Sequence, residues 1–156
     1  MPRTVYFRID NRLVHGQVIE AWLPYTGARD LVVANDALAE DMLRQQIISL
    51  AVPQRVAVHF IPLNALEATL AACEDTAFVL FMDCGDAFAA FSTGMPMSSL
   101  NIGNLHYSEG KRQLLPHVAV SPQEEGQLRS MRDAGVSLDF RCVPTENTRG
   151  LDVQLA

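Results

Sequence analysis

The feature that most constrains this chain is the alternation of short apolar or β-branched runs with segments of helical periodicity. The runs have the length and composition of β-strands: TVYFRI (4–9), DLVVAND (30–36), RVAVHFIPL (55–63), AFVLFM (77–82), SSLNIGNL (98–105), HVAV (117–120) and VSLDFRCV (136–143). Strands joined by single helices pair in parallel through right-handed crossovers. The alternation therefore predicts an α/β fold built on an open three-layer sheet.

Capping and turn residues mark where the helices begin and end. We expect the first helix to begin near Gly16 and to stop at Pro24, because proline usually ends a helix at the preceding residue. Asn35 or Asp36 can cap a second helix that continues to Pro53. Its apolar residues recur at helical spacing, which predicts that it lies on the sheet: Ala39, Met42, Leu43, Ile47, Leu50 and Ala51.

Segment 121–135 carries a complete helix signature. Ser121 stands at the N-cap, Pro122 occupies the first helical position and Glu124 is placed to close a capping box. Gly135 is suited to the helix end. In the run that follows, apolar residues alternate with more polar ones, which is typical of a strand at an exposed sheet edge.

The size and charge of the chain exclude several classes of protein. Its 156 residues, 49% of them hydrophobic, can bury one sizeable core. We expect a single domain over residues 1–156, ending in a polar tail from about residue 144. A net charge of −6 argues against nucleic-acid binding, which usually requires a basic surface. The apolar runs are shorter than the roughly 20 residues of a membrane-spanning helix, and the N-terminus lacks a signal peptide. We therefore expect a cytoplasmic protein.

The cysteines and histidines do not have the spacing of a metal site. Cys73, Cys84 and Cys142 are far apart and never form C-x-x-C, so we expect reduced thiols that pack as small apolar groups. The four histidines are scattered through the sequence, and His59 is expected to pack within its strand or at the sheet edge.

The loop after the first strand gathers the residues that could carry chemistry. In an open α/β sheet, ligands bind beyond the carboxyl ends of the strands, where loops lead into helix N-termini. His15 would stand at such a helix N-terminus, whose free N–H groups and dipole favour an anion. Arg8 and Arg12 can offer planar sets of donors to phosphate oxygens. Asp10 or Asn11 could orient an arginine or the imidazole.

Two interpretations of this loop fit its residues. It can be a phosphoryl-carrying site, because phosphoryl transfer asks mainly for a nucleophile, positioning and charge stabilisation, and requires no metal here. It can also be a polar connection with surface salt bridges and an incidental histidine, since such charge clusters are common and contribute little energy. Spacing alone favours the second interpretation.

Other polar segments carry weaker signals. The loop from His106 to Arg112 could border the first loop or simply be solvated. Asp36 and Asp83 follow strands and could line the same rim, although helix capping explains them as well. His117 begins a strand and carries no functional signal. The sequence contains neither G-x-G-x-x-G nor a Walker phosphate loop, so nothing in it supports a nucleotide site.

The segment RIDNRLVHGQV (8–18) closely resembles the phosphorylation-site loop of the IIB subunits of the mannose, fructose and sorbose family of bacterial sugar phosphotransferase systems. A form like RIDDRLIHGQV is typical there. The resemblance continues in order through LVVAND, PQRVAV, LNIGNLHYSEGKRQL and VPTE, and so covers nearly the whole chain. It implies a three-layer, doubly wound fold with a mainly parallel seven-stranded sheet and helices on both faces.

The resemblance also implies roles for the residues of the loop. His15 would carry the phosphoryl group on the ring nitrogen nearer the backbone. Arg8 and Arg12 would stabilise the phosphate, and Asp10 would be an orienting group. Replacing either arginine is expected to slow transfer and leave the fold intact. Further support for the phosphate would come from three positions in the loop and helix start: Asn11, which stands where the family often has aspartate, Gly16 and Gln17.

The implied activity connects two protein partners. The chain would accept a phosphoryl group from the phosphohistidine of a separate IIA protein and pass it to a sugar imported by membrane IIC and IID subunits. It would be a protein-N(π)-phosphohistidine–sugar phosphotransferase that works in the cytoplasm beside the permease, with no cofactor and no metal. Neither the sugar nor self-association follows from the sequence. An alternative is a regulatory signalling module that uses the same phosphorylation without a dedicated permease.

Overall fold

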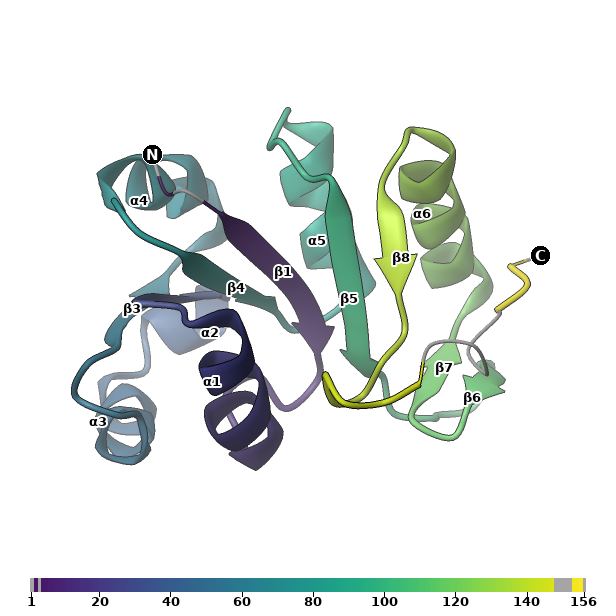
Figure 1. Cartoon of the computed structure of the whole chain (residues 1–156). Coiled ribbons are helices and arrows are strands. Elements are labelled where there is room, and N and C mark those ends of the chain that lie inside the picture. Colours follow the sequence, from purple (N-terminus) through teal and green to yellow (C-terminus); the bar gives the residue numbers. More distant parts are fainter. Residues whose placement is uncertain (1, 3, 148–152, 156) are drawn as a thin grey trace.

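The centre of the molecule is a six-stranded sheet. The structure is a computed structural model that describes residues 2, 4–147 and 153–155. The strand order is β3-β2-β4-β1-β5-β8, and every neighbouring pair is parallel (Figure 1). The strands are β1 (Val5–Asp10), β2 (Asp30–Ala34), β3 (Ala57–Ile61), β4 (Ala77–Phe81), β5 (Ser99–Asn104) and β8 (Ser137–Asp139). The predicted parallel α/β fold is confirmed.

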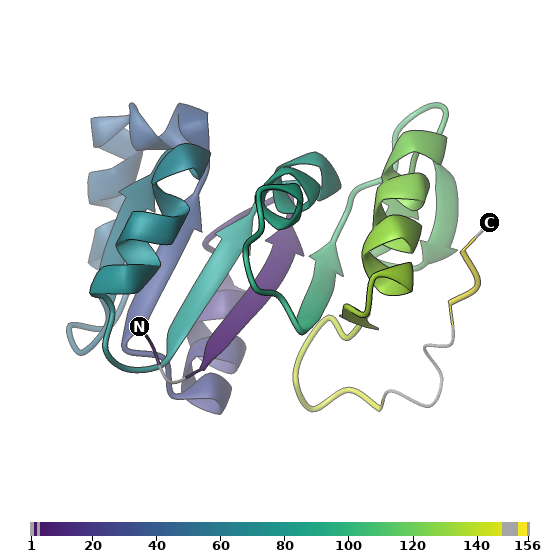
Figure 2. The same cartoon turned by 90° about the horizontal axis from the view of Figure 1, so that it is seen from above.

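Helices cover both faces of the sheet. One face carries the π-helical segment η1 (Val18–Trp22), α1 (Leu23–Thr26), α2 (Asp36–Ala39) and α3 (Met42–Ala51). The other carries the 3₁₀ turn η2 (Leu63–Ala65), α4 (Leu66–Ala72), α5 (Cys84–Ser92) and α6 (Pro122–Asp133). In Figure 1, α1 lies in front of the sheet and α5 and α6 lie behind it, and Figure 2 shows the layers from above.

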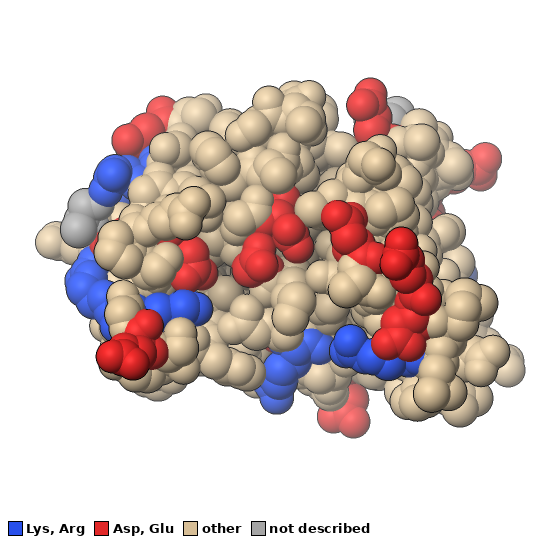
Figure 3. Space-filling model, turned by 180° about the vertical axis from the view of Figure 1, so that it is seen from behind, with Lys and Arg blue, Asp and Glu red and all other residues tan. Residues whose placement is uncertain are grey.

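An apolar core lies on each side of the sheet. Residues such as Trp22, Leu31 and Phe78 form one cluster, and residues such as Phe81 and Met131 form the other. All five residues of β4 are buried, which explains why its sequence is a continuous apolar run. The face covered by α4, α5 and α6 has acidic side chains across its middle and no continuous basic surface (Figure 3).

The main sheet has six strands rather than the expected seven, and the difference lies in the chain between β5 and α6. Strands β6 (Arg112–Leu115) and β7 (Val118–Val120) form a separate antiparallel hairpin. A bridge from Leu105 to Val118 joins β7 to the chain just beyond β5. Strand β6 is not among the strands that the sequence predicts, because its residues RQLL are neither β-branched nor alternating in polarity.

The first helix continues past Pro24, so the prediction that it stops there is wrong. Pro24 is the second residue of α1, where it follows η1, and the helix ends at Gly27 with a φ of 66°. The backbone N–H of Leu23 donates to the carbonyl of Val18, five residues earlier. Pro24 thus lies at the change from π-helix to α-helix, and its missing N–H is tolerated in the first turn of α1.

The second predicted helix is divided into α2 and α3. The side chains of Asn35 and Asp41 cap the two helices in turn. The cap at Asp41 starts a new helix, and Ile48 is the α3 residue that packs against the core. Most apolar side chains of α3 are exposed, up to 88% at Leu50. The prediction that this apolar face lies on the sheet is therefore wrong.

The end of the chain agrees with its sequence signals. Ser121 and Glu124 form the predicted capping box, with both hydrogen bonds at 3.1 Å. Gly135 follows α6 with a φ of 106°, and β8 lies at the sheet edge. The predicted tail has no helix or strand where it is described, and residues 148–152 and 156 lie outside the described residues. No helix in the described part of the chain is long and apolar enough to cross a membrane.

Candidate functional site

A buried ion pair at the end of β1 is the base of the site. Arg8 and Asp10 are two residues apart in the strand, so their side chains project from the same face of the sheet. Both side chains are fully buried, and Arg8 Nη2 lies 3.0 Å from Asp10 Oδ2. Burial lowers the pKa of Arg8 and the charge of Asp10 opposes this, so the guanidinium stays charged.

Every N–H group of the Arg8 guanidinium has an acceptor. Nε and Nη2 donate to Asp10, at 3.3 and 3.0 Å. Nη2 also donates to Gln17 Oε1 at 3.3 Å, and Nη1 donates to Asn101 Oδ1 at 2.6 Å and to the carbonyl of Cys142 at 3.1 Å. These contacts use all five donors. The structure therefore places Arg8 beneath the loop, as a buried scaffold, rather than at an exposed phosphate site.

A bulge in β5 brings two asparagines to this ion pair. Along β1 and β5, Ile9 pairs with Ile102 but Asp10 pairs with Asn104, so Gly103 is an extra residue. Residues three apart in a regular strand face opposite sides, whereas the bulge lets Asn101 and Asn104 reach the same side. The backbone passes so close to Arg8 that a Cβ atom on Gly103 would overlap its guanidinium.

The carboxylate of Asp10 organises the loop that follows β1. Oδ2 accepts hydrogen bonds from Arg8 and, at 2.9 Å, from Asn104 Nδ2. Oδ1 accepts the backbone N–H of Arg12 at 2.9 Å. Burial alone would raise the pKa of Asp10, but the hydrogen bonds to its oxygens and the charge of Arg8 outweigh burial and lower this pKa to about 2. Asp10 is therefore an anion at neutral pH.

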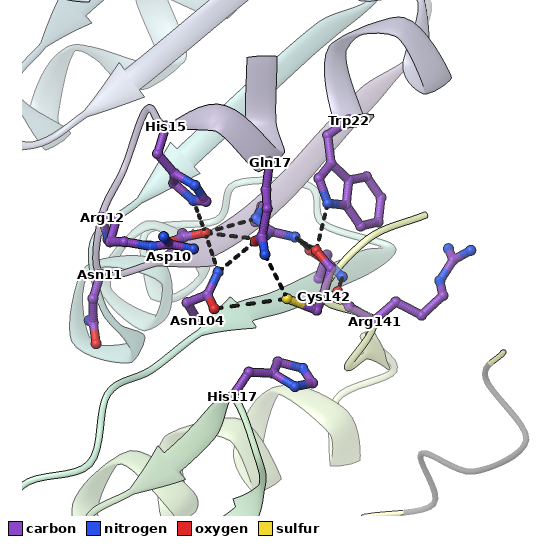
Figure 4. Close-up of polar contacts among 12 residues, drawn as sticks. Asp10, Asn11, Arg12, His15, Gln17, Trp22, Asn104, His117, Arg141 and Cys142 are labelled. Carbon is purple, nitrogen blue, oxygen red and sulfur yellow. Dashed lines mark hydrogen bonds and ion pairs between the residues drawn. The ribbon is translucent and has the colours of Figure 1, made fainter. Parts of the chain in front are cut away.

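His15 is held against Asp10 by one ring nitrogen. Its Nε2 lies 2.6 Å from Asp10 Oδ2, and its side chain is 13% exposed (Figure 4). An ionised carboxylate only accepts hydrogen bonds, so Nε2 carries the proton and Nδ1 carries the lone pair when the imidazole is neutral. Among the described residues, Nδ1 has no hydrogen-bond partner. The ring thus offers one defined nitrogen as a nucleophile.

The loop between Asp10 and His15 has a strained turn. Leu13 is a non-glycine residue with a positive φ of 53°, and its backbone N–H donates to the carbonyl of Asp10 at 2.9 Å. Its side chain is buried in the core next to α1. Burial and the turn hydrogen bond keep Leu13 in this conformation, whose cost is of order 1–3 kcal/mol. The helix then begins at Gly16, as predicted.

Distant segments close over the ion pair. The carbonyl of Cys142 accepts hydrogen bonds from Arg8 and from Trp22 Nε1, at 3.1 and 3.0 Å. Gln17 Nε2 donates to Cys142 Sγ at 3.2 Å, and Asn104 Nδ2 donates to Gln17 Oε1 at 2.9 Å. The Arg8 guanidinium also lies over the indole of Trp22, 5.2 Å from the ring centroid. Figure 4 shows these side chains converging from η1, β5 and the segment after β8.

Arg12 and Asn11 take different positions in the loop. The Arg12 side chain is exposed and makes no hydrogen bond or ion pair among the described residues. Asn11 connects three loops: its Nδ2 donates to the carbonyl of Met82 at 2.8 Å, and its Oδ1 accepts the backbone N–H of His106 at 2.7 Å. Gly16 is exposed at the helix start, with open space around the position of a Cβ.

The other sequence candidates lie outside this network. His106 touches it only through its backbone N–H. Lys111 and Arg112 pair with glutamates of α6, and His117 Nε2 contacts the carbonyl of Phe140 at 2.8 Å. Two aspartates that follow strands bond to backbone: Asp83 caps α5, and Asp36 accepts the N–H of Leu63.

Sequence reasoning missed the residues that come from far along the chain, because no local pattern links them to β1: Asn101, Gly103, Asn104 and Cys142. Cys142 is also partly exposed, whereas Cys73 and Cys84 are buried as expected. One usable signal was present. A glycine between two asparagines inside a strand, as in NIGN, is typical of a bulge or a close approach of the backbone.

The comparison with known families identifies this chain. The family described as PTS system sorbose subfamily IIB component matches residues 4–156. The chain belongs to this family. As a IIB component it is a phosphoryl carrier for sugar uptake and a sugar phosphotransferase. The buried Arg8–Asp10 pair and the His15 loop therefore lie in a protein whose chemistry is phosphoryl transfer.

Individual relatives agree with this assignment over most of their length. The N-acetylgalactosamine-specific phosphotransferase enzyme IIB component 2 of Escherichia coli K12 is 34% identical over 149 residues, with 94% of both chains covered. The sorbose-specific EIIB component of Klebsiella pneumoniae is 31% identical, with 89% of this chain and 87% of that protein covered. The crystal structure of the IIBSor domain of the sorbose permease from Klebsiella pneumoniae superposes with a TM-score of 0.83 at 29% identity and covers 92% of this chain and 91% of that one.

The close approach of Gly103 to Arg8 predicts that a side chain at this position destabilises the protein. Gly103→Ala places a methyl group on the Arg8 guanidinium, so Arg8 must leave Asp10 and one buried charge loses its partner. We expect a loss of about 3 kcal/mol in the free energy of unfolding, measured with urea. Gly126→Ala in α6 is the matched control, because its nearest neighbour would be 3.7 Å away and alanine suits a helix. Equal stability of the two variants would contradict the close approach.

The lowered pKa of Asp10 predicts an acid-dependent loss of stability. Asp10 has a lower pKa in the folded protein than its ordinary value of 3.8, so its stabilising contribution is complete above about pH 4 and is lost as the pH falls toward 2. Over this range the free energy of unfolding should decrease by about 2 kcal/mol more in the wild type than in Asp10→Asn. Asp133→Asn, at an exposed site, should keep the wild-type dependence. Parallel pH curves for wild type and Asp10→Asn would disprove the role of this carboxylate.

Proposed function

We propose that His15 Nδ1 is the atom that carries the phosphoryl group. The observation that supports this most directly is the 2.6 Å contact between His15 Nε2 and Asp10, which leaves Nδ1 as the free nucleophile. In the first transfer the bond between phosphorus and the donor's histidine nitrogen breaks and a bond from phosphorus to Nδ1 forms. The imidazole then bears a positive charge, which the Asp10 carboxylate stabilises through the proton on Nε2.

The second transfer reverses these changes. A sugar hydroxyl attacks the phosphorus and loses its proton to solvent, the bond from phosphorus to Nδ1 breaks, and the imidazole returns to its neutral form with its proton still on Nε2. Asp10 accepts the same hydrogen bond in both steps. The carrier can therefore act twice without a change of tautomer.

Arg12 and Arg8 have different roles in the proposed site. Arg12, exposed and without a side-chain partner among the described residues, is suited to donate to the phosphate oxygens. The helix that begins at Gly16 adds backbone N–H groups of its first turn, including those of Gly16 and Gln17. Arg8 uses all its donors within the protein, so it acts as a positioning residue that holds Asp10. Asn11 fixes the position of the loop through its hydrogen bonds to the carbonyl of Met82 and the backbone N–H of His106.

The family supports a specific set of partners. We infer a separate IIA protein as phosphohistidine donor, and membrane IIC and IID subunits that hold the sugar. The chain would act at the cytoplasmic side, beside the permease, as one domain over residues 1–156. Relatives of similar identity have names that specify different sugars, N-acetylgalactosamine and sorbose. The sugar is therefore set elsewhere than in the residues shared with these proteins.

Phosphorylation of the purified chain tests the role of His15. Incubation with a phosphorylated IIA protein should give an acid-labile, alkali-stable label that His15→Ala abolishes and His106→Ala retains. Nitrogen NMR of the phosphorylated chain should place the phosphate on Nδ1. A phosphate on Nε2, or full labelling of His15→Ala, would refute the proposal.

Replacement of Arg12 should affect mainly the rate of transfer, whereas replacement of Arg8 should affect mainly the stability of the fold. Arg12→Gln should slow transfer at least tenfold, through the loss of a charge-assisted contact of about 1.5–3 kcal/mol, and should change the free energy of unfolding by less than about 0.5 kcal/mol. Arg8→Gln should instead cost about 3–5 kcal/mol of stability, because Asp10 would remain buried without its partner. The exposed Arg55 gives a control, and Arg55→Gln should alter neither property. A stable Arg8→Gln variant would show that the buried pair is dispensable.

A further inference from the structure

A second cluster of reactive side chains lies at the opposite end of the sheet from His15. It lines a cavity of about 500 Å³, formed in part by Asp30, His59 and Cys73. Asp30 is the first residue of β2, His59 lies in β3, and Cys73 directly follows α4. His15 belongs to the loop after the carboxyl end of β1. Because the strands are parallel, the amino end of β2 lies at the opposite end of the sheet from the carboxyl end of β1.

The three side chains direct their donor atoms toward one another. The carboxylate oxygen, imidazole nitrogen and thiol sulfur all lie within 4.8 Å of one another. His59 Nε2 is 2.8 Å from Asp30 Oδ1, and the Cys73 thiol faces the same carboxylate. The residues come from three different elements, so their convergence is a product of the fold. Sequence spacing, which predicts no metal site, could not show it.

We propose that Asp30, His59 and Cys73 form a binding site for Zn²⁺. Thiolate, imidazole and carboxylate are the three side-chain types that bind this ion in proteins. Bonds of about 2.0–2.3 Å in tetrahedral geometry place ligand atoms about 3.5 Å apart. The atoms here need small side-chain rotations to reach such a spacing. The cavity leaves a fourth position open to water.

Metal binding requires a defined change in protonation. Burial and the Asp30 carboxylate both raise the pKa of the Cys73 thiol, so the thiol is protonated at neutral pH and one proton leaves when sulfur binds the ion. In the metal-free protein His59 donates its Nε2 proton to Asp30, so binding of the ion through Nε2 requires the neutral imidazole to carry its proton on Nδ1 instead. The ion replaces the direct contact between His59 and Asp30 with two metal–ligand bonds.

A simpler account of the cluster is an ion pair beside a packed thiol. Cys73 is 4% exposed and its Sγ donates to the carbonyl of Thr69 at 3.3 Å, as a thiol at a helix end often does. This account predicts no affinity for metal ions. The two accounts therefore give different results with the metal alone.

Cobalt titration of the full chain tests the site, because a thiolate bound to Co²⁺ gives a charge-transfer band in the near ultraviolet. The wild type should show this band with one ion per chain, and Zn²⁺ should remove it by displacement. Cys73→Ala should abolish the band and His59→Ala should weaken cobalt binding at least tenfold. Cys142→Ala and His106→Ala are the matched controls and should retain it. Circular dichroism verifies that each variant is folded.

Thermal unfolding gives a second readout. Zn²⁺ at a hundredfold excess over its dissociation constant should raise the unfolding midpoint of the wild type by about 5 °C or more, and that of Cys73→Ala should not change. Phosphorylation of His15 should be the same in Cys73→Ala and wild type, so this test is independent of the phosphoryl-carrier role. Absence of the cobalt band in the wild type, or its persistence in Cys73→Ala, would overturn the proposal.

Discussion

The buried pair of Arg8 and Asp10 is the interaction on which the site depends. A charge without exposure to water is costly unless it is paired and its remaining hydrogen-bonding groups are satisfied. Arg8 meets this demand with acceptors from Gln17 just before η1, from β5 and from the segment after β8. The need to satisfy one guanidinium therefore draws together parts of the chain that are more than 130 residues apart.

The same pair connects stability with chemistry. Asp10 Oδ2 is shared between Arg8, Asn104 and His15, so the groups that make the ion pair favourable also orient the imidazole. The bulge at Gly103 is required for both, because it provides the space for Arg8 and turns Asn104 toward Asp10. The His15 ring is thus positioned by the core of the protein, although it belongs to a loop.

Sequence patterns predicted the parts of this structure that depend on near neighbours. The strand–helix alternation, the capping box at Ser121 and the helix start at Gly16 are local features, and the structure has them. The burial of Arg8 could not be predicted, because an arginine at a strand end is usually solvated and its partners lie far away in the sequence. The exposed face of α3 was also missed, since helical spacing of apolar residues, such as Leu50, shows that a face exists but not what covers it.

A carrier that meets two partners in turn needs a nucleophile whose orientation does not depend on either. The strained turn at Leu13 shows how the fold provides this: its positive φ persists because the side chain is buried and its N–H is bound by Asp10. With the loop fixed at Leu13 and the ring fixed through Nε2, the direction of Nδ1 is set before any partner arrives. In the proposed function, the charge that appears on the imidazole is balanced by a carboxylate already in place, so little reorganisation would accompany either transfer. Under this proposal, exchange of the donor for the sugar would change only the group that faces Nδ1.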